Sequence, residues 1–107
     1  MTISVLFGVR SATLDEARAL VEQALGIVFE ERESLHHGGR YFAFGKPGLR
    51  DLILQQNVDL LDDEPAEPNF TNYGHLLYLD AATEHSSFLT ALQDAPELFV
   101  TLRTKVR

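Results

Sequence analysis

Four histidines are the side chains of this sequence best suited to acid–base or metal chemistry. His75 lies within the apolar stretch GHLLYLD, so it is interpreted either as a buried imidazole bonded to the backbone or as a contact to a ligand. His36 and His37 are adjacent and precede two glycines, and because neighbouring side chains need not converge, we interpret them as turn residues rather than a metal pair. His85 stands near the start of a predicted helix and is expected to be solvated. None of the four is assigned a catalytic role.

Other motifs that serve catalysis are incomplete. The glycines within 38–39 and 45–48 do not precede a helix with the Lys-Ser or Lys-Thr ending of a phosphate-binding loop. Ser86 and Ser87 lack a nearby elbow or an oriented base, and the absence of cysteine removes thiolate nucleophiles, thiolate zinc sites and disulfides. The sequence leaves enzymatic activity open and favours a protein without it.

The charge and hydropathy of the chain limit its partners. Nine basic and sixteen acidic side chains give a net charge of −7, which opposes binding to a phosphate backbone, so nucleic acid is not expected. No apolar run approaches the roughly 20 residues that cross a bilayer, and no signal peptide is evident, so we expect a cytoplasmic protein without membrane contact. The surplus of carboxylates either favours a cationic ligand or a basic protein, or serves only solubility.

The best-defined element is the stretch from Thr13 to Phe29. Thr13 can accept a hydrogen bond from the amide of Glu16, whose carboxylate can reach back to Thr13, as in a capping box. Gly26 favours the left-handed backbone that commonly ends a helix, and residues 27–29, which are β-branched or aromatic, then favour a strand. The pattern predicts a helix that starts at Thr13, ends at Gly26 and buries one side.

The remaining elements follow from alternation and turn residues. Further strands are predicted at 1–9, 40–44, 49–56, 71–79 and 98–106. The glycines within 36–39 and 45–48 predict reversals between strands. Asp80 or Thr83 can cap a second helix, and its apolar stripe is Phe88, Leu89 and Leu92.

The two halves of the chain match in pattern when one is displaced by 71 positions. Strand, helix and strand then coincide in pseudo-repeats 1–57 and 70–107, which residues 58–69 join as an acidic, proline-containing linker within a single domain, 1–107. The expected fold class is α+β, with a βαβββ module followed by a shortened βαβ module, a mixed sheet and two helices on one face. The second module lacks two strands and leaves an exposed edge, which predicts a homodimer.

The pattern resembles the vicinal oxygen chelate superfamily, which contains glyoxalases, bleomycin-resistance proteins and extradiol dioxygenases. The similarity rests on SVLFGV followed by LDEARALVEQALGIVFEERES, on GGRYFAFG with RDLILQQN, and on GHLLYLD followed by a helix. It covers most of the chain. The resemblance implies paired βαβββ modules with a ligand on the concave face of the sheet, often beside a divalent metal.

The metal positions that the resemblance implies are poorly matched here. The first-strand position is Ser4, the fourth-strand position is Gln55 or Gln56, and the fifth-strand histidine is His75. The position on the final strand of a complete second module has no counterpart. Because zinc and iron sites usually need three or four protein ligands, we expect no metal and no cofactor unless a dimer mate supplies ligands.

These observations lead to a metal-free protein that binds or sequesters a small aromatic or cationic molecule. The residues expected to line its cavity, on the sheet face opposite the helices, are Leu6, Ile53, Gln55, His75 and Leu77. One alternative is an acidic interaction protein of the immunity type, which neutralises a basic partner through the segment 59–67. Another is a lyase or dioxygenase-like enzyme with a site completed across the dimer.

Overall fold

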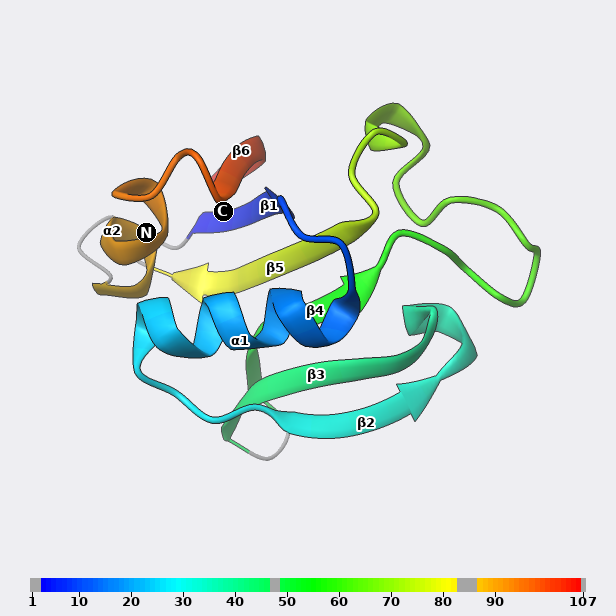
Figure 1. Cartoon of the computed structure of the whole chain (residues 1–107), viewed down its shortest axis with the longest axis horizontal. Coiled ribbons are helices and arrows are strands. Elements are labelled where there is room, and N and C mark those ends of the chain that lie inside the picture. Colours follow the sequence, from blue (N-terminus) through cyan, green and yellow to red (C-terminus); the bar gives the residue numbers. More distant parts are fainter. Residues whose placement is uncertain (1–2, 47–48, 83–86, 107) are drawn as a thin grey trace.

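The computed structural model describes residues 3–46, 49–82 and 87–106, which form one antiparallel sheet and two α-helices (Figure 1). The strands are β1 Ile3–Val9, β2 Glu30–Ser34, β3 Gly39–Lys46, β4 Leu49–Gln56, β5 His75–Ala82 and β6 Phe99–Val106. The helices are α1 Leu14–Leu25 and α2 Ser87–Gln93, and two short 3-10 turns are η1 Leu35–His37 and η2 Pro68–Phe70. The predicted α+β class is confirmed.

The strand order in the sheet is β2-β3-β4-β5-β1-β6, and every neighbouring pair is antiparallel. The prediction of a mixed sheet is therefore wrong. A strand–helix–strand unit such as β5-α2-β6 makes a parallel pair only when its two strands are adjacent. Here β1 lies between β5 and β6 and runs antiparallel to both, so strands from the two halves of the chain alternate over β4-β5-β1-β6.

Helix α1 begins and ends as its sequence predicts. The Thr13 Oγ1 accepts a hydrogen bond from the amide of Glu16 at 3.0 Å, while the Glu16 carboxylate accepts from the amide of Ala12 at 3.4 Å. Gly26 has a φ of 66°, and its N–H donates to the carbonyl of Glu22 at 2.8 Å. This geometry satisfies backbone groups at both ends of the helix and fixes the position of Ser11 and Ala12 before it.

The chain after α1 differs from the prediction, because residues 27–29 form a connection and β2 starts only at Glu30. The Phe29 N–H donates to the Glu22 carboxylate at 2.8 Å, and the Phe29 ring is buried beside Phe42. Val28 is 81% exposed. The connection therefore ties the helix to the sheet. Residues 27–29 favour a strand by their intrinsic propensity, but they do not form one because the chain must cross here from the helix layer to the sheet.

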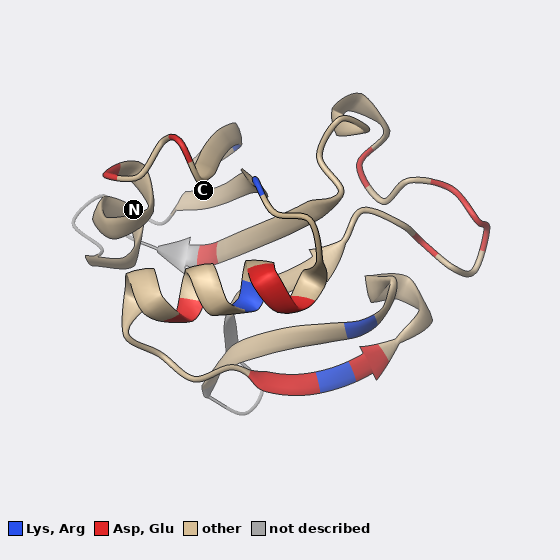
Figure 2. Ribbon diagram, in the orientation of Figure 1, with Lys and Arg blue, Asp and Glu red and all other residues tan. Residues whose placement is uncertain are grey.

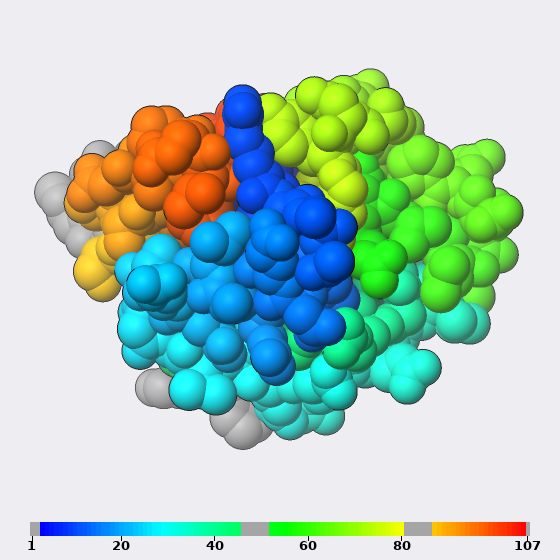
Figure 3. Space-filling view, viewed as in Figure 1, coloured from blue at the N-terminus to red at the C-terminus, as the bar shows by residue number. Residues whose placement is uncertain are grey.

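The hydrophobic core lies between α1 and one face of the sheet, here called the α1 face. Buried side chains of this core from β1, β3, β4, β5 and β6 are Val5, Phe7, Val9, Phe42, Leu52, Leu54, Leu77, Leu79 and Phe99. They pack with Leu14, Ala17 and Val21 of α1 and with Leu89 and Leu92 of α2. In the space-filling view, α1 and the segment before it cover the centre of this side (Figure 3).

The second helix buries part of its predicted stripe. Leu89 and Leu92 are buried, and Phe88 packs edge-on against Phe44 with ring centroids 5.9 Å apart. Asp80 lies inside β5, so the prediction that it caps this helix is wrong; Thr83 and His85 lie outside the described residues, as does the turn at 47–48.

The segment between β4 and β5, residues 57–74, is here called the acidic loop. The side-chain amide of Asn57 donates to the carbonyls of Phe70 and Tyr73 at 3.0 Å each, and its oxygen accepts from the amide of Glu67 at 2.8 Å. Asp59 and Glu64 form an isolated β-bridge within it. The prolines and acidic residues predict a linker, whereas the structure shows a segment folded around one half-buried amide, that of Asn57.

The acidic loop packs on the sheet face opposite α1, here called the open face. A Cβ atom at Gly8 would collide with the ring of Tyr73, so this ring lies directly over the Gly8 backbone. Asp and Glu residues occur along this loop and along the edge strand β2, where the ribbon is red (Figure 2). Charges along an edge strand oppose pairing with another sheet. Among the described helices, none is long and apolar enough to cross a membrane.

Candidate ligand-binding site

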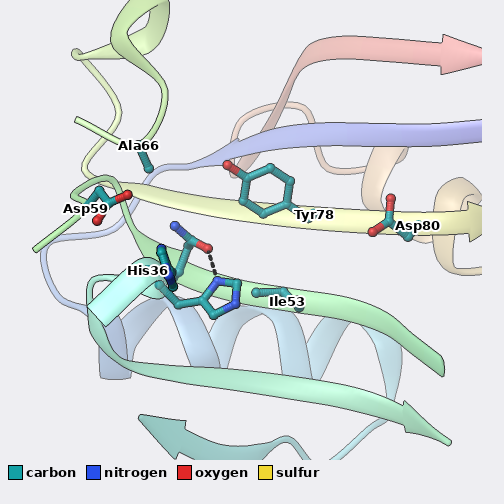
Figure 4. A pocket seen from close by; sticks show the side chains of 8 residues that line it. His36, Ile53, Asp59, Ala66, Tyr78 and Asp80 are labelled. Carbon is teal, nitrogen blue, oxygen red and sulfur yellow. Dashed lines mark hydrogen bonds between the residues drawn. The ribbon is translucent and has the colours of Figure 1, made fainter. Parts of the chain in front are cut away.

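A hollow of about 350 Å³ lies on the open face, between the sheet, η1 and the acidic loop (Figure 4). The residues that line it are His36, His37, Ile53, Gln55, Asp59, Ala66, Tyr78 and Asp80. Ile53 and Tyr78 are cross-strand partners in β4 and β5, and their side chains form its floor. The two edges come from segments that lie outside the regular strands, because His36 belongs to η1 and Asp59 to the acidic loop.

One wall of the hollow contains a part-buried hydrogen-bonded pair, Gln55 and His37. Gln55 is only 3% exposed, and its Oε1 lies 2.8 Å from the Nδ1 of His37. Because an amide oxygen only accepts, Nδ1 carries the proton, and Nε2 of the neutral ring is an acceptor. The ring of His37 also packs against the Tyr41 ring in a tilted arrangement, with centroids 4.4 Å apart. The hydrogen bond and the ring contact together hold His37 in one orientation at the wall of the hollow.

Two carboxylates stand at opposite ends of this hollow. Asp59 and Asp80 are separated in the close view by the side chains of Ile53 and Tyr78 (Figure 4). One Asp59 oxygen accepts from the amide of Leu61 at 3.0 Å, which orients the carboxylate within the loop. No Lys or Arg belongs to the described residues that line the hollow. Its charge therefore favours a positively charged guest.

A charged cluster connects the acidic loop to the sheet beside the hollow. The Glu67 carboxylate, whose side chain is only 14% exposed, lies 2.7 Å from the Arg103 guanidinium of β6. The Tyr78 hydroxyl donates to the same carboxylate. Burial is the main reason that the pKa of Tyr78 is raised far above its usual value, and the nearby Glu67 charge adds to it. The phenol therefore remains a donor at neutral pH and holds the loop in place.

A smaller hollow of about 150 Å³ adjoins the first on the open face. The residues that line it are Ser4, Val5, Leu6, Tyr78, Asp80, Arg103 and Lys105. Tyr78 and Asp80 belong to both hollows, so the two share a wall. The Ser4 hydroxyl oxygen is buried and has no hydrogen-bond partner within residues 3–46, 49–82 and 87–106.

A third hollow, of about 330 Å³, lies near the start of α1 and is lined by Val9, Arg10, Ser11, Asn72, Tyr73 and Gly74. The Ser11 Oγ lies 3.1 Å from the Nδ1 of His75 just beside it. Burial lowers the pKa of His75 below its usual value, which favours the neutral ring. The contact ties the chain before α1 to the start of β5, so His75 has a partner within the protein, Ser11.

The five residues predicted to line one cavity lie on two faces of the sheet. Ile53 and Gln55 line the larger hollow, and Leu6 lines the smaller one. Leu77 is fully buried in the core against α1, and His75 shares its face two residues earlier. The prediction that all five share the face opposite the helices is therefore wrong for His75 and Leu77. The error is a shift of one residue in β5, which exchanges every side chain between the faces.

The implied metal positions do not converge in this fold. Ser4 and Gln55 point to the open face, whereas His75 lies on the α1 face. The alternative position, Gln56, is the cross-strand partner of His75, so it lies beside His75 but not on the face of Ser4. Among the described residues, no group of three or more histidine, aspartate or glutamate side chains could hold a metal ion. The chemistry that the open face offers is charge attraction, hydrogen bonding and aromatic contact.

Sequence reasoning missed several residues of the larger hollow: His36, His37, Asp59, Ala66, Tyr78 and Asp80. Asp80 carried a usable signal, because a charged residue near the end of an apolar strand favours the less buried face and places Tyr78 on that face too. The contribution of η1 and the acidic loop had no such signal, since it depends on contacts between segments far apart in sequence.

Comparison of the chain with models of protein families, with curated sequences and with solved structures gave no match. The candidate site therefore rests on its own geometry.

Proposed function

We propose that this protein binds a small cationic molecule, with or without an aromatic ring, in the larger hollow of the open face and performs no metal-dependent chemistry there. The observation that carries the proposal is that two carboxylates, Asp59 and Asp80, lie at opposite ends of a hollow whose described lining contains no Lys or Arg. A positively charged guest would gain from both carboxylates, and more so where the walls exclude water.

The other lining residues suit an amine or an aromatic cation. The Tyr78 ring offers a face to a cation, and Ile53 offers apolar contact to a short chain or a ring. The acceptor nitrogen of His37 can receive a hydrogen bond from an ammonium group. The hollow is thus compatible with primary amines as well as with flat cationic ligands.

The resemblance to the glyoxalase and bleomycin-resistance type is part of this proposal. The element order β1-α1-β2-β3-β4 followed by β5-α2-β6 supports it, as does the shared core of α1 and α2, which suits two helices on one side of the sheet.

We also propose a homodimer, because the edge strand β6 ends in an exposed Val106 and offers unpaired backbone groups along one side. Light scattering at several concentrations tests this part, and a monomer at every concentration would contradict it.

The binding proposal is tested by a thermal-shift screen of primary amines and aromatic cations, followed by calorimetric titration of the hits. A ligand at one hundred times its Kd stabilises the fold by about 2.7 kcal/mol, which is well within detection. The variant Asp59→Asn keeps an oxygen for the amide of Leu61 and removes only the charge, so we expect it to weaken binding about tenfold. Absence of any shift across the library would contradict the proposal.

Asp62→Asn provides the matched control for this variant. Asp62 lies in the same loop, is exposed, and also uses its carboxylate to accept a backbone N–H, that of Glu64 at 3.2 Å. It does not belong to the lining of the hollow. Equal weakening by Asp59→Asn and Asp62→Asn would show that net charge, rather than the hollow, attracts the ligand.

A second candidate function is binding of a basic protein through the acidic loop. The observation that favours it is the exposure of three leucines, Leu35 at 53%, Leu60 at 46% and Leu61 at 56%, next to the carboxylates of residues 62–64. The backbone of Leu60 donates to the carbonyl of Leu35 at 3.1 Å, so two of these leucines are neighbours. An apolar patch with an acidic rim is typical of a surface that contacts a partner.

This candidate is tested by comparing partner recovery on the native chain and on a variant with Asp62, Asp63 and Glu64 changed to Ser. A variant with Glu30, Glu31 and Glu33 changed to Ser removes the same charge from the edge strand β2 and is the control. We expect only the loop variant to lose the partner. Unchanged recovery on the loop variant would remove the acidic loop from the function.

A further inference from the structure

The two hollows of the open face meet at the Tyr78 and Asp80 side chains that both of them use. The larger one ends at the acidic loop, and the smaller one ends at the outer strands β1 and β6. A molecule that occupies both would cross the sheet from β4 over β5 to β1, following the cross-strand row of Ile53, Tyr78 and Leu6. This row supplies an apolar and aromatic middle section.

The lining becomes less negative along this path. The larger hollow holds Asp59 and Asp80 with no Lys or Arg in its described lining, whereas the smaller one adds Arg103 and Lys105 to the shared Asp80. Arg103 is already paired with Glu67 at 2.7 Å, which leaves Lys105 as the cation without a salt bridge among the described residues. Asp80 belongs to both linings and offsets the Lys105 charge in the smaller hollow, so the β6 end is less negative than the loop end. An anionic group is therefore favoured beside Lys105 at the β6 end, and a cationic group beside Asp59 at the loop end.

The Ser4 hydroxyl gives a second reason, independent of the charges, to place the anionic group of the ligand at the β6 end. It lines the smaller hollow, and Ser4 is the cross-strand partner of Lys105. A buried hydroxyl oxygen without a partner is costly, so native proteins usually satisfy such a group. A carboxylate beside Lys105 could accept the Ser4 O–H after a small side-chain rotation.

We infer that the ligand is an elongated zwitterion, with an ammonium group between Asp59 and His37 and a carboxylate at Ser4 and Lys105, joined by a short alkyl chain over Ile53 and Tyr78. This inference rests on the proposed function, because it uses the same hollow for the cationic end. It adds the anionic end and the length of the ligand. An ω-amino acid is the simplest molecule of this class.

The test is calorimetric titration of the native chain with 4-aminobutyrate, 6-aminohexanoate and 8-aminooctanoate. The tightest of the three is compared with the alkylamine and the carboxylic acid of the same length. We expect the zwitterion to bind at least tenfold more tightly than either molecule with a single charge. Lys105→Gln should reduce the affinity for the zwitterion about tenfold and leave the affinity for the amine unchanged. Arg32→Gln, on the distant edge strand β2, is the charge-matched control and should change neither.

The outcomes separate this inference from the proposed function. If the amine binds as tightly as the zwitterion and Lys105→Gln has no effect, the anionic end is wrong, while the cationic site stands when Asp59→Asn still weakens the amine. If Lys105→Gln and Arg32→Gln weaken the zwitterion equally, general charge explains the effect and the inference is overturned. If neither the amines nor the zwitterions bind, both proposals are wrong.

Discussion

The two faces of this sheet differ in how completely their side chains are packed. On the α1 face, Phe7, Leu77 and Leu92 are fully buried, and the core they form packs against the helices. On the open face, Gln55 and Tyr78 lie under a loop that covers only one end of the sheet, and hollows remain beside them. The helices pack against the α1 face without leaving a hollow among these core side chains, whereas the acidic loop, which is held by a few polar contacts, leaves room for a ligand on the open face.

The polar contacts on the open face are fewer but specific. Asn57 holds the acidic loop together, Glu67 connects it to Arg103 and Tyr78, and the Tyr73 ring rests on Gly8. Each contact depends on one side chain, so a single substitution should move the loop without unfolding the core. Substitutions on the two faces should therefore differ in their effect on stability.

The largest difference between the faces should appear when one sheet side chain on each face is truncated to alanine. Leu77→Ala leaves a cavity in a filled core, so we expect the free energy of unfolding in urea to fall by about 2–5 kcal/mol. Ile53→Ala removes a half-buried side chain beside an existing hollow, and we expect a loss of about 1 kcal/mol. Equal losses would show that the open face is packed as tightly as the core.

The contact between Gly8 and Tyr73 is tested by adding one methyl group. Gly8→Ala places a Cβ where the Tyr73 ring now lies, and overpacking of this kind costs about 1–3 kcal/mol. The double variant Gly8→Ala with Tyr73→Ala should recover part of this loss in urea unfolding. If Gly8→Ala is as stable as the native chain, the Tyr73 ring does not rest on the sheet.

The link from the sheet to Glu67 is tested by removing one hydroxyl. Tyr78→Phe leaves the Glu67 carboxylate with one donor fewer, and we expect a loss of about 1–2 kcal/mol in the free energy of unfolding. Tyr73→Phe removes a hydroxyl from another ring of the same face and is the control, with a smaller expected change. An unchanged free energy of unfolding for Tyr78→Phe would mean that the Tyr78 hydroxyl adds nothing to the pairing of Glu67 with Arg103.

The smallest effect should be a change in pH dependence at the end of the α1 face. Burial lowers the pKa of His75, so below about pH 6.5 the unfolded chain binds this proton more readily than the folded one. Stability from the neutral ring is thus present above that pH and is lost as the pH falls, with the Glu16 charge opposing the loss. His75→Asn should reduce the fall in stability measured between about pH 7 and pH 5. An unchanged fall would show that other groups cause it.

Local signals in the sequence predicted much of the fold. The capping residue Thr13 and the terminating Gly26 set the ends of α1 because their effects involve neighbouring residues only. The glycines at 38 and 39 allow the turn between β2 and β3, where Gly38 has a φ of 77°. These features need no knowledge of distant contacts.

The placement of β5 could not be derived with the same reliability. Its residues Leu76, Leu77, Tyr78 and Leu79 are apolar on both sides, so alternation does not say which set faces α1. Its position between β4 and β1 depends on pairing between segments far apart in the chain. The candidate site could not be derived for the same two reasons, the ambiguous alternation of β5 and the dependence on long-range contacts, because it combines β5 with η1 and the acidic loop.

The most direct test of the open-face site is a titration of the ¹⁵N-labelled chain with hexylamine, followed by two-dimensional NMR. We expect progressive shifts of the amides of Gln55, Tyr78 and Asp59 and of the Gln55 side-chain amide, while the amides of Leu77 and Leu92 in the core change little. Shifts confined to the α1 side or to the hollow near Ser11, or no shifts at saturating hexylamine, would contradict the account.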